Sequence, residues 1–410
     1  MENPKIRFKG YTKDWEQRKL GDMGSTFTGL SGKTKEDFGH GDAQFITYMN
    51  VFSNPVANLE MTEAVEIDAK QNRVKKGDVF FTTSSETPEE VGMSCVMPEN
   101  KDNIYLNSFC FGYRPTEKFD LDYLAYVLRA DSFRKEMKFL AQGISRYNIS
   151  KNKVMEVSIP IPNLEEQTMV GRYFSTLDHL ITLHQRKCEQ TKKLKKYMLQ
   201  KMFPQNGAKV PEIRFDGFTY DWEQRKLSDV LDIVTKRNGE KYGKEEVLSV
   251  SDEYGCINQI KFQGRSFAGE DISNYKIVDT GDIIYTRSPL KSKPYGIIKV
   301  VGDEIGIVSP LYIVNKVKEG NNSQFIYRVF DSPEKTNKYL SPLVRKGAKN
   351  TMNISNDEWL SGKIDVAPSY EEQYQIGLYF DHLDNLITLH QRQCDELKKM
   401  KKYMLQNMFI

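Results

Sequence analysis

The sequence of 410 residues lacks the long apolar runs of a membrane protein, so we expect no membrane-spanning helix. Its first residues lack the basic and apolar regions of a secretory signal. Cysteine is scarce, with five residues and no C-x-x-C pair. An odd number of cysteines without an export signal favours reduced thiols. These absences predict a cytoplasmic protein without a membrane partner.

Signatures of catalysis are also missing. No G-x-S-x-G or H-E-x-x-H motif occurs, and there are only five histidines. Gly29–Thr34 ends like a phosphate-binding loop, but Phe27 stands where the first glycine of that motif belongs. Lys293-Pro294-Tyr295 only faintly resembles the Asn-Pro-Pro-Tyr element of amino-methyltransferases, and no Gly-rich cofactor loop precedes it. We expect no catalytic residue, no cofactor and no metal on this chain.

The chain does contain two copies of one unit, which is its most informative feature. The segment W-E-Q-R-K-L occurs at Trp15–Leu20 and returns 207 residues later at Trp222–Leu227. The segment L-I-T-L-H-Q-R occurs at Leu180–Arg186 and returns 206 residues later at Leu386–Arg392. Repeats of this length predict two similar domains related by an internal pseudo-twofold axis.

Between these repeated segments the two copies diverge, and only short matches survive. Gly77-Asp78 before an apolar run matches Gly281-Asp282, and Asn148-Ile149-Ser150 matches Asn353-Ile354-Ser355. The divergent spans are nearly equal in length. We therefore expect one fold with two different surfaces, as two readers of different targets would have.

The divergent spans alternate like short strands separated by turn residues. The expected strands are 78–82, 104–113, 282–286 and 297–301, and helical spacing marks 120–140. This pattern predicts an α+β fold with a curved mixed sheet in each copy. The expected domains are 1–162 and 207–369, with a long central helix at 163–206 and a long C-terminal helix at 370–410.

Each expected helix carries an apolar seam with 3-4 spacing, typical of a coiled coil. The first seam is Phe174, Leu177, Ile181, His184 and Cys188, and it then shifts to Leu194, Tyr197 or Met198, and Met202. The second seam is Phe380, Leu383, Ile387, His390, Cys394 and Met400. A helix of about 35 residues spans about 50 Å, and two such helices should pack antiparallel.

The antiparallel arrangement predicts a polar layer in this seam. His184 would face Cys394, and Cys188 would face His390. Two imidazoles and two thiolates suit tetrahedral zinc. The favoured interpretation is a layer that fixes the register of the helix pair without metal.

Two polar segments in each copy suit DNA. One follows the Gly-Asp strand and the other precedes Asn-Ile-Ser, and their side chains are of types that bond base edges and phosphates. The alternative is that they are ordinary polar loops. The candidate DNA-binding residues are Thr83, Ser84, Ser85, Gln142, Ser145, Arg146 and Tyr147 in the first copy, and Arg287, Lys291, Lys293, Arg345, Lys346, Lys349 and Asn350 in the second. The net charge of +3 permits a nucleic-acid partner without requiring one.

Taken in order and twice over, the W-E-Q-R-K-L segment, the Gly-Asp strand, Asn-Ile-Ser, Glu-Glu-Gln and the L-I-T-L-H-Q-R helix resemble the specificity subunits of type I restriction–modification systems along nearly the whole chain. The resemblance implies two target recognition domains that each read half of a bipartite, asymmetric site in double-stranded DNA, with the helices setting the gap. It also implies two modification (adenine methyltransferase) subunits and restriction (motor-nuclease) subunits as partners. S-adenosylmethionine, ATP and Mg²⁺ would then bind those partners and not this chain.

Two alternatives to this non-catalytic role remain. One is a fused methyltransferase with its own catalytic site, which the missing cofactor motifs disfavour. The other is a coiled-coil scaffold that does not bind nucleic acid.

Overall fold

The structure is a computed structural model that describes residues 3–205, 207–291, 293–346 and 352–409, with Lys346 described by its backbone alone. The chain forms two compact units. Unit 1 consists of residues 1–185 and 391–410, and unit 2 consists of residues 186–390. Each unit contains one globule and part of each long helix. None of the described helices is long and apolar enough to cross a bilayer.

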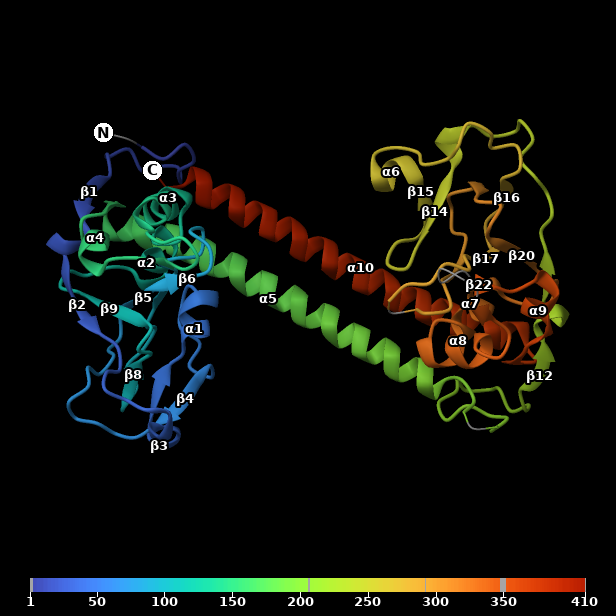
Figure 1. Ribbon diagram of the computed structural model, residues 1–410, viewed down its shortest axis with the longest axis horizontal. Helices are drawn as coiled ribbons and strands as arrows, with labels where there is room; N and C mark the ends of the chain where they lie inside the picture. The colour runs from blue at the N-terminus through green and yellow to red at the C-terminus, as the bar shows by residue number, and fades with distance from the viewer. Residues whose placement is uncertain (1–2, 206, 292, 347–351, 410) are drawn as a thin grey trace. The chain divides into compact units, whose positions relative to one another are not determined.

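The globule of unit 1 is built on an antiparallel sheet with the strand order β2-β9-β5-β7 (Figure 1). A second sheet has the order β4-β3-β8, in which β3 is antiparallel to β4 and parallel to β8. The pairs β1·β11 and β6·β10 form two-stranded ribbons. The strands are β1 Glu16–Lys19, β2 Gly24–Thr28, β3 Phe38–Ile46, β4 Thr62–Val65, β5 Val79–Thr82, β6 Ser84–Ser85, β7 Ser94–Val96, β8 Ile104–Leu106, β9 Cys110–Pro115, β10 Tyr147–Asn148 and β11 Ser158–Ile161.

Short helices cover this sheet, and two of them correct the predicted helical stretch 120–140. Asp120 caps the first of the two by accepting a hydrogen bond from the Tyr123 backbone N–H at 3.0 Å. The stretch then breaks at residues 128–130. The helices of the globule are α1 Tyr48–Ser53, α2 Leu121–Val127, α3 Asp131–Leu140 and α4 Lys151–Met155.

The prediction of one strand over 104–113 was also wrong. The span contains β8 and β9, which belong to different sheets. Between them the chain turns at Asn107, whose side chain accepts a hydrogen bond from the Phe109 backbone N–H at 2.8 Å. An Asn side chain that bonds the backbone two residues ahead is a common way to make such a turn.

Unit 2 repeats this plan with a sheet of order β13-β20-β17-β18 and the ribbons β12·β23, β14·β15, β16·β19 and β21·β22 (Figure 1). The strands are β12 Glu223–Lys226, β13 Leu231–Ile233, β14 Leu248–Ser251, β15 Gly255–Asn258, β16 Lys276–Val278, β17 Ile283–Tyr285, β18 Ile298–Val300, β19 Gly306–Val308, β20 Ile313–Val317, β21 Arg345–Lys346, β22 Met352–Asn353 and β23 Lys363–Val366. The short helices are α6 Gln259–Gln263, α7 Ser323–Val329, α8 Pro333–Leu340 and α9 Asn356–Ser361.

The predicted long helices are confirmed as α5 Leu164–Lys201 and α10 Tyr370–Asn407, each of 38 residues. Each begins beside a side chain that accepts a backbone N–H. Asn163 accepts from Glu166 at 3.0 Å, and Ser369 accepts from Glu372 at 3.4 Å. Both helices carry two glutamates in their first turn, where the helix dipole favours negative charge.

Within each unit, segments of α5 and α10 pack in opposite directions. In unit 1 Phe174 of α5 stacks on Phe409, just after α10. Asp178, one turn further along α5, pairs at 2.6 Å with Lys401, which lies about two turns before Phe409. In unit 2 Lys195 pairs with Asp384 at 2.7 Å, and Phe203 lies against Phe380. Rising numbers on one helix therefore meet falling numbers on the other.

The predicted seam is correct where the helices bury Phe174, Leu177, Ile181 and Cys188, and again at Met202. It was wrong for Leu194 and Met400, which occupy equivalent positions in the repeat and are 45% and 48% exposed. Beyond Cys188 the buried positions move to Leu199 and Met202. The apolar side chains left outside face solvent.

The W-E-Q-R-K-L segments join the helices to the globules. Trp15 packs edge-on against Tyr123 and Phe409, and Trp222 packs in the same way against Phe203 and Phe325. Below we call the two W-E-Q-R-K-L segments and the two long helices the framework.

Candidate nucleic-acid interface

The two candidate segments of unit 1, about 60 residues apart in sequence, lie together in the structure. β6 pairs with β10, so Ser84 lies opposite Asn148 and Ser85 opposite Tyr147. The Ile149 N–H also donates to the Thr83 carbonyl at 3.0 Å. Two segments selected for residue type alone therefore form one surface.

The side chains within this surface differ in exposure. Ser84 and Ser85 are buried, and the Ser84 hydroxyl accepts a hydrogen bond from Arg146 Nε at 3.3 Å. The Thr83 hydroxyl donates to the Phe109 carbonyl at 2.7 Å. The Ser84 hydroxyl therefore contacts the segment that carries Arg146, whereas the Thr83 hydroxyl bonds the residue before β9. Gln142, Ser145 and Arg146 are exposed, and Tyr147 is half-buried.

A tight loop projects from this ribbon. Gln142 and Asn148 exchange two backbone hydrogen bonds of 2.9 and 2.8 Å, which close the loop at its base. Gly143 has φ of +147°, and a Cβ there would lie 2.0 Å from the Arg146 carbonyl oxygen, so the loop requires glycine. Ile144 at its tip is 97% exposed. Sequence reasoning missed Ile144 because an apolar residue does not mark a polar loop.

A half-buried tyrosine, Tyr48, contacts the same surface. The Tyr48 hydroxyl donates to the Ser84 carbonyl at 2.7 Å, and burial raises the pKa of Tyr48 above its usual value. The phenol therefore stays neutral and keeps its role as a donor. This contact links α1 to the candidate surface.

In unit 2 the β21·β22 ribbon lies within the second candidate segment, with Arg345 opposite Asn353 and Lys346 opposite Met352. The first segment reaches this one through the side chain of Arg287. Arg287 follows the Gly-Asp strand, and its guanidinium donates to the carbonyls of Leu311 and Ile354. Its φ of +55° is rare for a residue other than glycine. The side chain of Arg287 thus ties both segments to the sheet.

The remaining candidates in unit 2 are placed less uniformly. Lys291 is exposed, Lys293 forms an ion pair with Asp252 in the turn after β14, and Arg345 forms an ion pair with Glu358 at 3.2 Å while staying largely exposed. Lys349 and Asn350 lie outside the described residues.

Positive charge gathers beside Arg287. Lys276 donates to the Tyr312 carbonyl at 2.7 Å, and burial, with the charges of Arg287 and Arg237, lowers the pKa of Lys276. The positive charges of Lys276, Arg237 and Arg287 repel one another, and a nearby anion such as a phosphate would relieve this repulsion. Sequence reasoning missed Lys276 and Arg237, although Arg237-Asn238-Gly239 carries a turn signal beside a basic residue.

The aspartate of each Gly-Asp motif stabilises the turn before its strand and is not part of the candidate DNA-binding surface. Asp78 is buried and forms two hydrogen bonds of 2.7 Å with the Arg114 guanidinium. Asp282 is also buried, and burial raises its pKa to about 6. Both carboxylates accept a backbone N–H three residues earlier, from Lys75 and Asp279, and so hold the turn before the strand.

The residues of the expected polar layer lie on the long helices. Cys188 and Cys394 are buried, and His184 and His390 are half-buried. Cys188 Sγ lies 3.8 Å from the Ile387 carbonyl oxygen within unit 2. Among the described residues, no three His, Cys, Asp or Glu side chains are arranged to hold a metal ion. The role of this layer in fixing register stays a prediction.

Comparison with known proteins gives the family of this fold. The model of the type I restriction modification DNA specificity domain matches twice, at residues 12–193 and 220–399. The chain belongs to this family. The two matches follow the internal repeat, and each contains one globule and most of the long helix after it.

Relatives and solved structures agree with this family. The chain is 25% identical over 420 aligned residues to the putative type I restriction enzyme MjaX specificity subunit of Methanocaldococcus jannaschii, covering 95% of this chain and 91% of that protein. It is 26% identical to the MjaVIII specificity subunit of the same organism, over 68% of this chain and 67% of that protein. The crystal structure of a type I restriction–modification S subunit from M. genitalium has the same fold, with a TM-score of 0.64, 14% identity and coverage of 100% and 99%.

Proposed function

We propose that this DNA specificity protein reads a bipartite, asymmetric sequence in double-stranded DNA, with each unit reading one half. One observation carries the proposal. In both units, the segment after the Gly-Asp strand contacts the segment around Asn-Ile-Ser, through the β6·β10 ribbon in unit 1 and through the Arg287 side chain in unit 2, yet the residues of the two surfaces differ. A repeated framework with different surfaces suits two different half-sites.

The two surfaces also differ in charge, as readers of different sequences would. Unit 1 presents Arg146 beside the apolar tip Ile144, whereas unit 2 gathers Arg237, Lys276 and Arg287. Arginine and lysine bond guanine edges and phosphates, and an exposed aliphatic side chain suits a thymine methyl group. The cations of unit 2 would gain most from phosphate contact.

The framework supports the second part of the proposal, in which the chain recruits two copies of a modification subunit. Leu194 and Tyr197 are 45% and 49% exposed on α5. Their equivalents in the repeat, Met400 and Tyr403, are 48% and 57% exposed on α10. Equivalent apolar patches that recur in both units suit the same partner bound twice, because exposed apolar side chains grouped in this way mark protein contacts. Restriction subunits would then join the complex through these partners.

The DNA-reading proposal is tested by Arg146→Ala in the complex of the full chain with its modification subunits. We expect binding to the cognate duplex to weaken by about 1–3 kcal/mol and discrimination to relax in one half-site only. The matched control is Lys118→Ala, which removes an exposed cation of unit 1 outside both segments. Equal losses in both variants would contradict the assignment.

The scaffold alternative gives a different result in this experiment. A coiled-coil scaffold without DNA binding would show no preference for the cognate duplex over an unrelated one. The fused-methyltransferase alternative predicts that the isolated chain binds S-adenosylmethionine, which equilibrium dialysis measures directly.

A further inference from the structure

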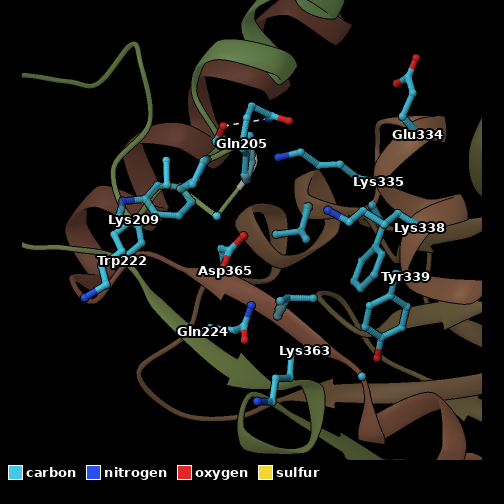
Figure 2. A pocket seen from close by; sticks show the side chains of 18 of the residues that line it. Gln205, Lys209, Trp222, Gln224, Glu334, Lys335, Lys338, Tyr339, Lys363 and Asp365 are labelled. Atoms are coloured by element: carbon cyan, nitrogen blue, oxygen red, sulfur yellow. Dashed lines mark hydrogen bonds between the residues drawn. The ribbon is translucent and has the colours of Figure 1, made fainter. Parts of the chain in front are cut away.

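Unit 2 contains a cavity of about 750 Å³ that includes none of the candidate reading residues. Its walls come from α8, from the β12·β23 ribbon and from residues 203–205 and 207–209 after α5. Figure 2 shows Lys335 and Lys338 extending from α8 toward the side of the cavity where Asp365 lies. The volume lies within the range of about 300–1,000 Å³ typical of small-molecule sites.

The charge in this cavity is not balanced. Burial lowers the pKa of Lys335 to about 8, an effect that Asp365 opposes and Lys338 increases. The Lys335 ammonium lies 4.5 Å from the centre of the Phe203 ring, a contact that partly offsets its burial. In the described part of the chain, no carboxylate lies within 4.0 Å of either ammonium. Two neighbouring cations therefore share the cavity with two carboxylates, Glu334 and Asp365, and neither carboxylate forms an ion pair with them.

The repeat supplies an internal comparison. The sequence D-S-x-x-K-x-x-K-aromatic-Leu occurs at 131–140 on α3 and at 331–340 on α8. In unit 1, Lys135 pairs with Asp131 at 2.9 Å, and Lys138 forms an ion pair with Glu89. The same two lysines are thus paired with acids in unit 1 and not in unit 2.

Asp331, four residues before Lys335, is held by other cations. The Arg328 guanidinium pairs with Asp331 at 2.7 Å. Lys195 contacts the same carboxylate at 2.7 Å. Burial alone would raise the pKa of Asp331, but these two cations hold it below its usual range. Asp331 is therefore turned away from Lys335.

From this geometry we propose that the cavity binds a small phosphate-bearing anion of about the size of a mononucleotide. Phosphate oxygens would accept hydrogen bonds from the ammonium groups of Lys335 and Lys338, which replaces like-charge repulsion with charge-assisted bonds. The amide of Gln224 and the ring of Tyr339 line the same space (Figure 2) and offer contacts for the rest of the molecule.

Depth favours a small molecule over a DNA backbone. Lys335 is half-buried and lies over the buried Phe203, whereas Lys338 and Lys363 are exposed. A duplex phosphate would meet the exposed lysines first. The proposal is independent of DNA reading, because it concerns the chain alone and small anions.

The experiment is calorimetric titration of the full chain with inorganic phosphate and with AMP. We expect both probes to bind, and AMP more tightly because it also fills the part of the cavity next to Tyr339. The double variant Lys335→Gln/Lys338→Gln should weaken both by on the order of tenfold or more. The matched control Lys135→Gln/Lys138→Gln changes the equivalent lysines of unit 1 and should leave both affinities within about twofold.

A pH series on the unaltered chain tests the site without any substitution. A bound phosphate raises the pKa of Lys335, so binding takes up protons near pH 8, and affinity should fall as the pH rises through about 8. No binding of either probe, or equal losses in both double variants, would overturn the proposal. So would a weaker salt dependence of duplex binding in the unit 2 variant, because that result would assign the lysines to the DNA backbone.

Discussion

The two units share one framework but stabilise it through different interiors. The ion pairs made by the long helices occur at equivalent residues in the two units. In each unit an arginine that precedes the W-E-Q-R-K-L segment binds a glutamate of a long helix through two hydrogen bonds. The pairs are Arg7–Glu166 and Asp178–Lys401 in unit 1, and Arg214–Glu372 and Lys195–Asp384 in unit 2. The ion pairs of the long helices are therefore the same in both units, although the two globules differ in sequence.

The interiors beneath this framework differ most at one position of the helix that packs on it. In unit 1 the Tyr126 hydroxyl donates to Asp178 at 2.8 Å. In unit 2 Arg328 takes that place and contacts three carboxylates, those of Asp331, Asp381 and Asp384. The comparison teaches that the framework tolerates a hydrogen bond or an ion network at the same site. The two choices should respond very differently to mutation.

The largest expected effect is the loss of this buried arginine. Arg328→Met should destabilise unit 2 by about 3–5 kcal/mol, because it takes the guanidinium from the buried Asp331 and the half-buried Asp381 and Asp384 and leaves Lys195 to pair with Asp331 and Asp384. Tyr126→Phe removes one hydrogen bond and should cost unit 1 about 1 kcal/mol. Hydrogen exchange measured by mass spectrometry separates the two units. Similar losses of protection from hydrogen exchange in the two variants would contradict the idea that the hydrogen bond of unit 1 and the ion network of unit 2 contribute differently to stability.

The next effect concerns partner binding. The double variant Leu194→Ser/Tyr197→Ser should weaken the binding of one modification subunit by about 2–4 kcal/mol. Met400→Ser/Tyr403→Ser should weaken the binding of the other. Light scattering of the purified complex would then show one copy lost in each variant and both lost in the combination. Lys193→Ser is the exposed control on α5. Retention of two copies in the combined variant would remove these patches from the interface.

A smaller effect separates the two Gly-Asp strands. Asp78→Asn should destabilise unit 1 by about 1–3 kcal/mol, since Arg114 loses its carboxylate. Asp282→Asn should instead stabilise unit 2 at pH 7 by about 1–2 kcal/mol, because the native charge there is disfavoured by burial.

The pH dependence of the stability of unit 2 tests whether the charge on Asp282 is destabilising. The pKa of Asp282 is about 6 when folded and 3.8 as its usual value, so the folded state holds the proton more tightly. The free energy of unfolding of unit 2 should therefore fall as the pH rises from about 4 through about 6. Asp282→Asn should flatten this part of the curve. An unchanged curve would mean that another group titrates there.

The smallest effect concerns the framework tryptophans. Trp222 Nε1 donates to Glu372 at 3.1 Å, whereas Trp15 Nε1 is buried without a hydrogen-bond partner in the described structure. Trp222→Phe should therefore cost about 1 kcal/mol more than Trp15→Phe, because only the former removes a side-chain hydrogen bond, one of those that Glu372 accepts. Urea unfolding of each variant, followed by hydrogen exchange, measures this difference. A larger loss for Trp15→Phe would contradict the account.

The framework could be predicted from sequence because its signals are local or repeated. Helical spacing and absence of proline gave α5 from Leu164, and the structure ends it at Lys201. The Gly-Asp strands were also placed within a residue or two, since Gly77 and Gly281 take positive φ in the preceding turn. Breaks that depend on tertiary contacts were not predictable, and the prediction of one helix over 120–140 shows this.

The candidate surface was only partly predictable for the same reason. Residue type selected the right segments, but the pairing of β6 with β10 joins residues about 60 apart in sequence, which no local pattern encodes. Burial of Ser84 and Ser85 follows from that pairing. The unpaired lysines of unit 2 depend on Arg328, whose effect on Asp331 appears only when the helices are packed.

The central claim is that each unit reads one half of a two-part DNA sequence. The most direct test replaces residues 21–150 with the corresponding span of another specificity subunit and keeps the framework and unit 2 intact. Long-read sequencing of methylated genomic DNA from cells carrying the complete system then reports the modified sequence. We predict that one half of the methylated sequence changes while the other half stays the same. A change in both halves, or in neither half of an active variant, would contradict the account.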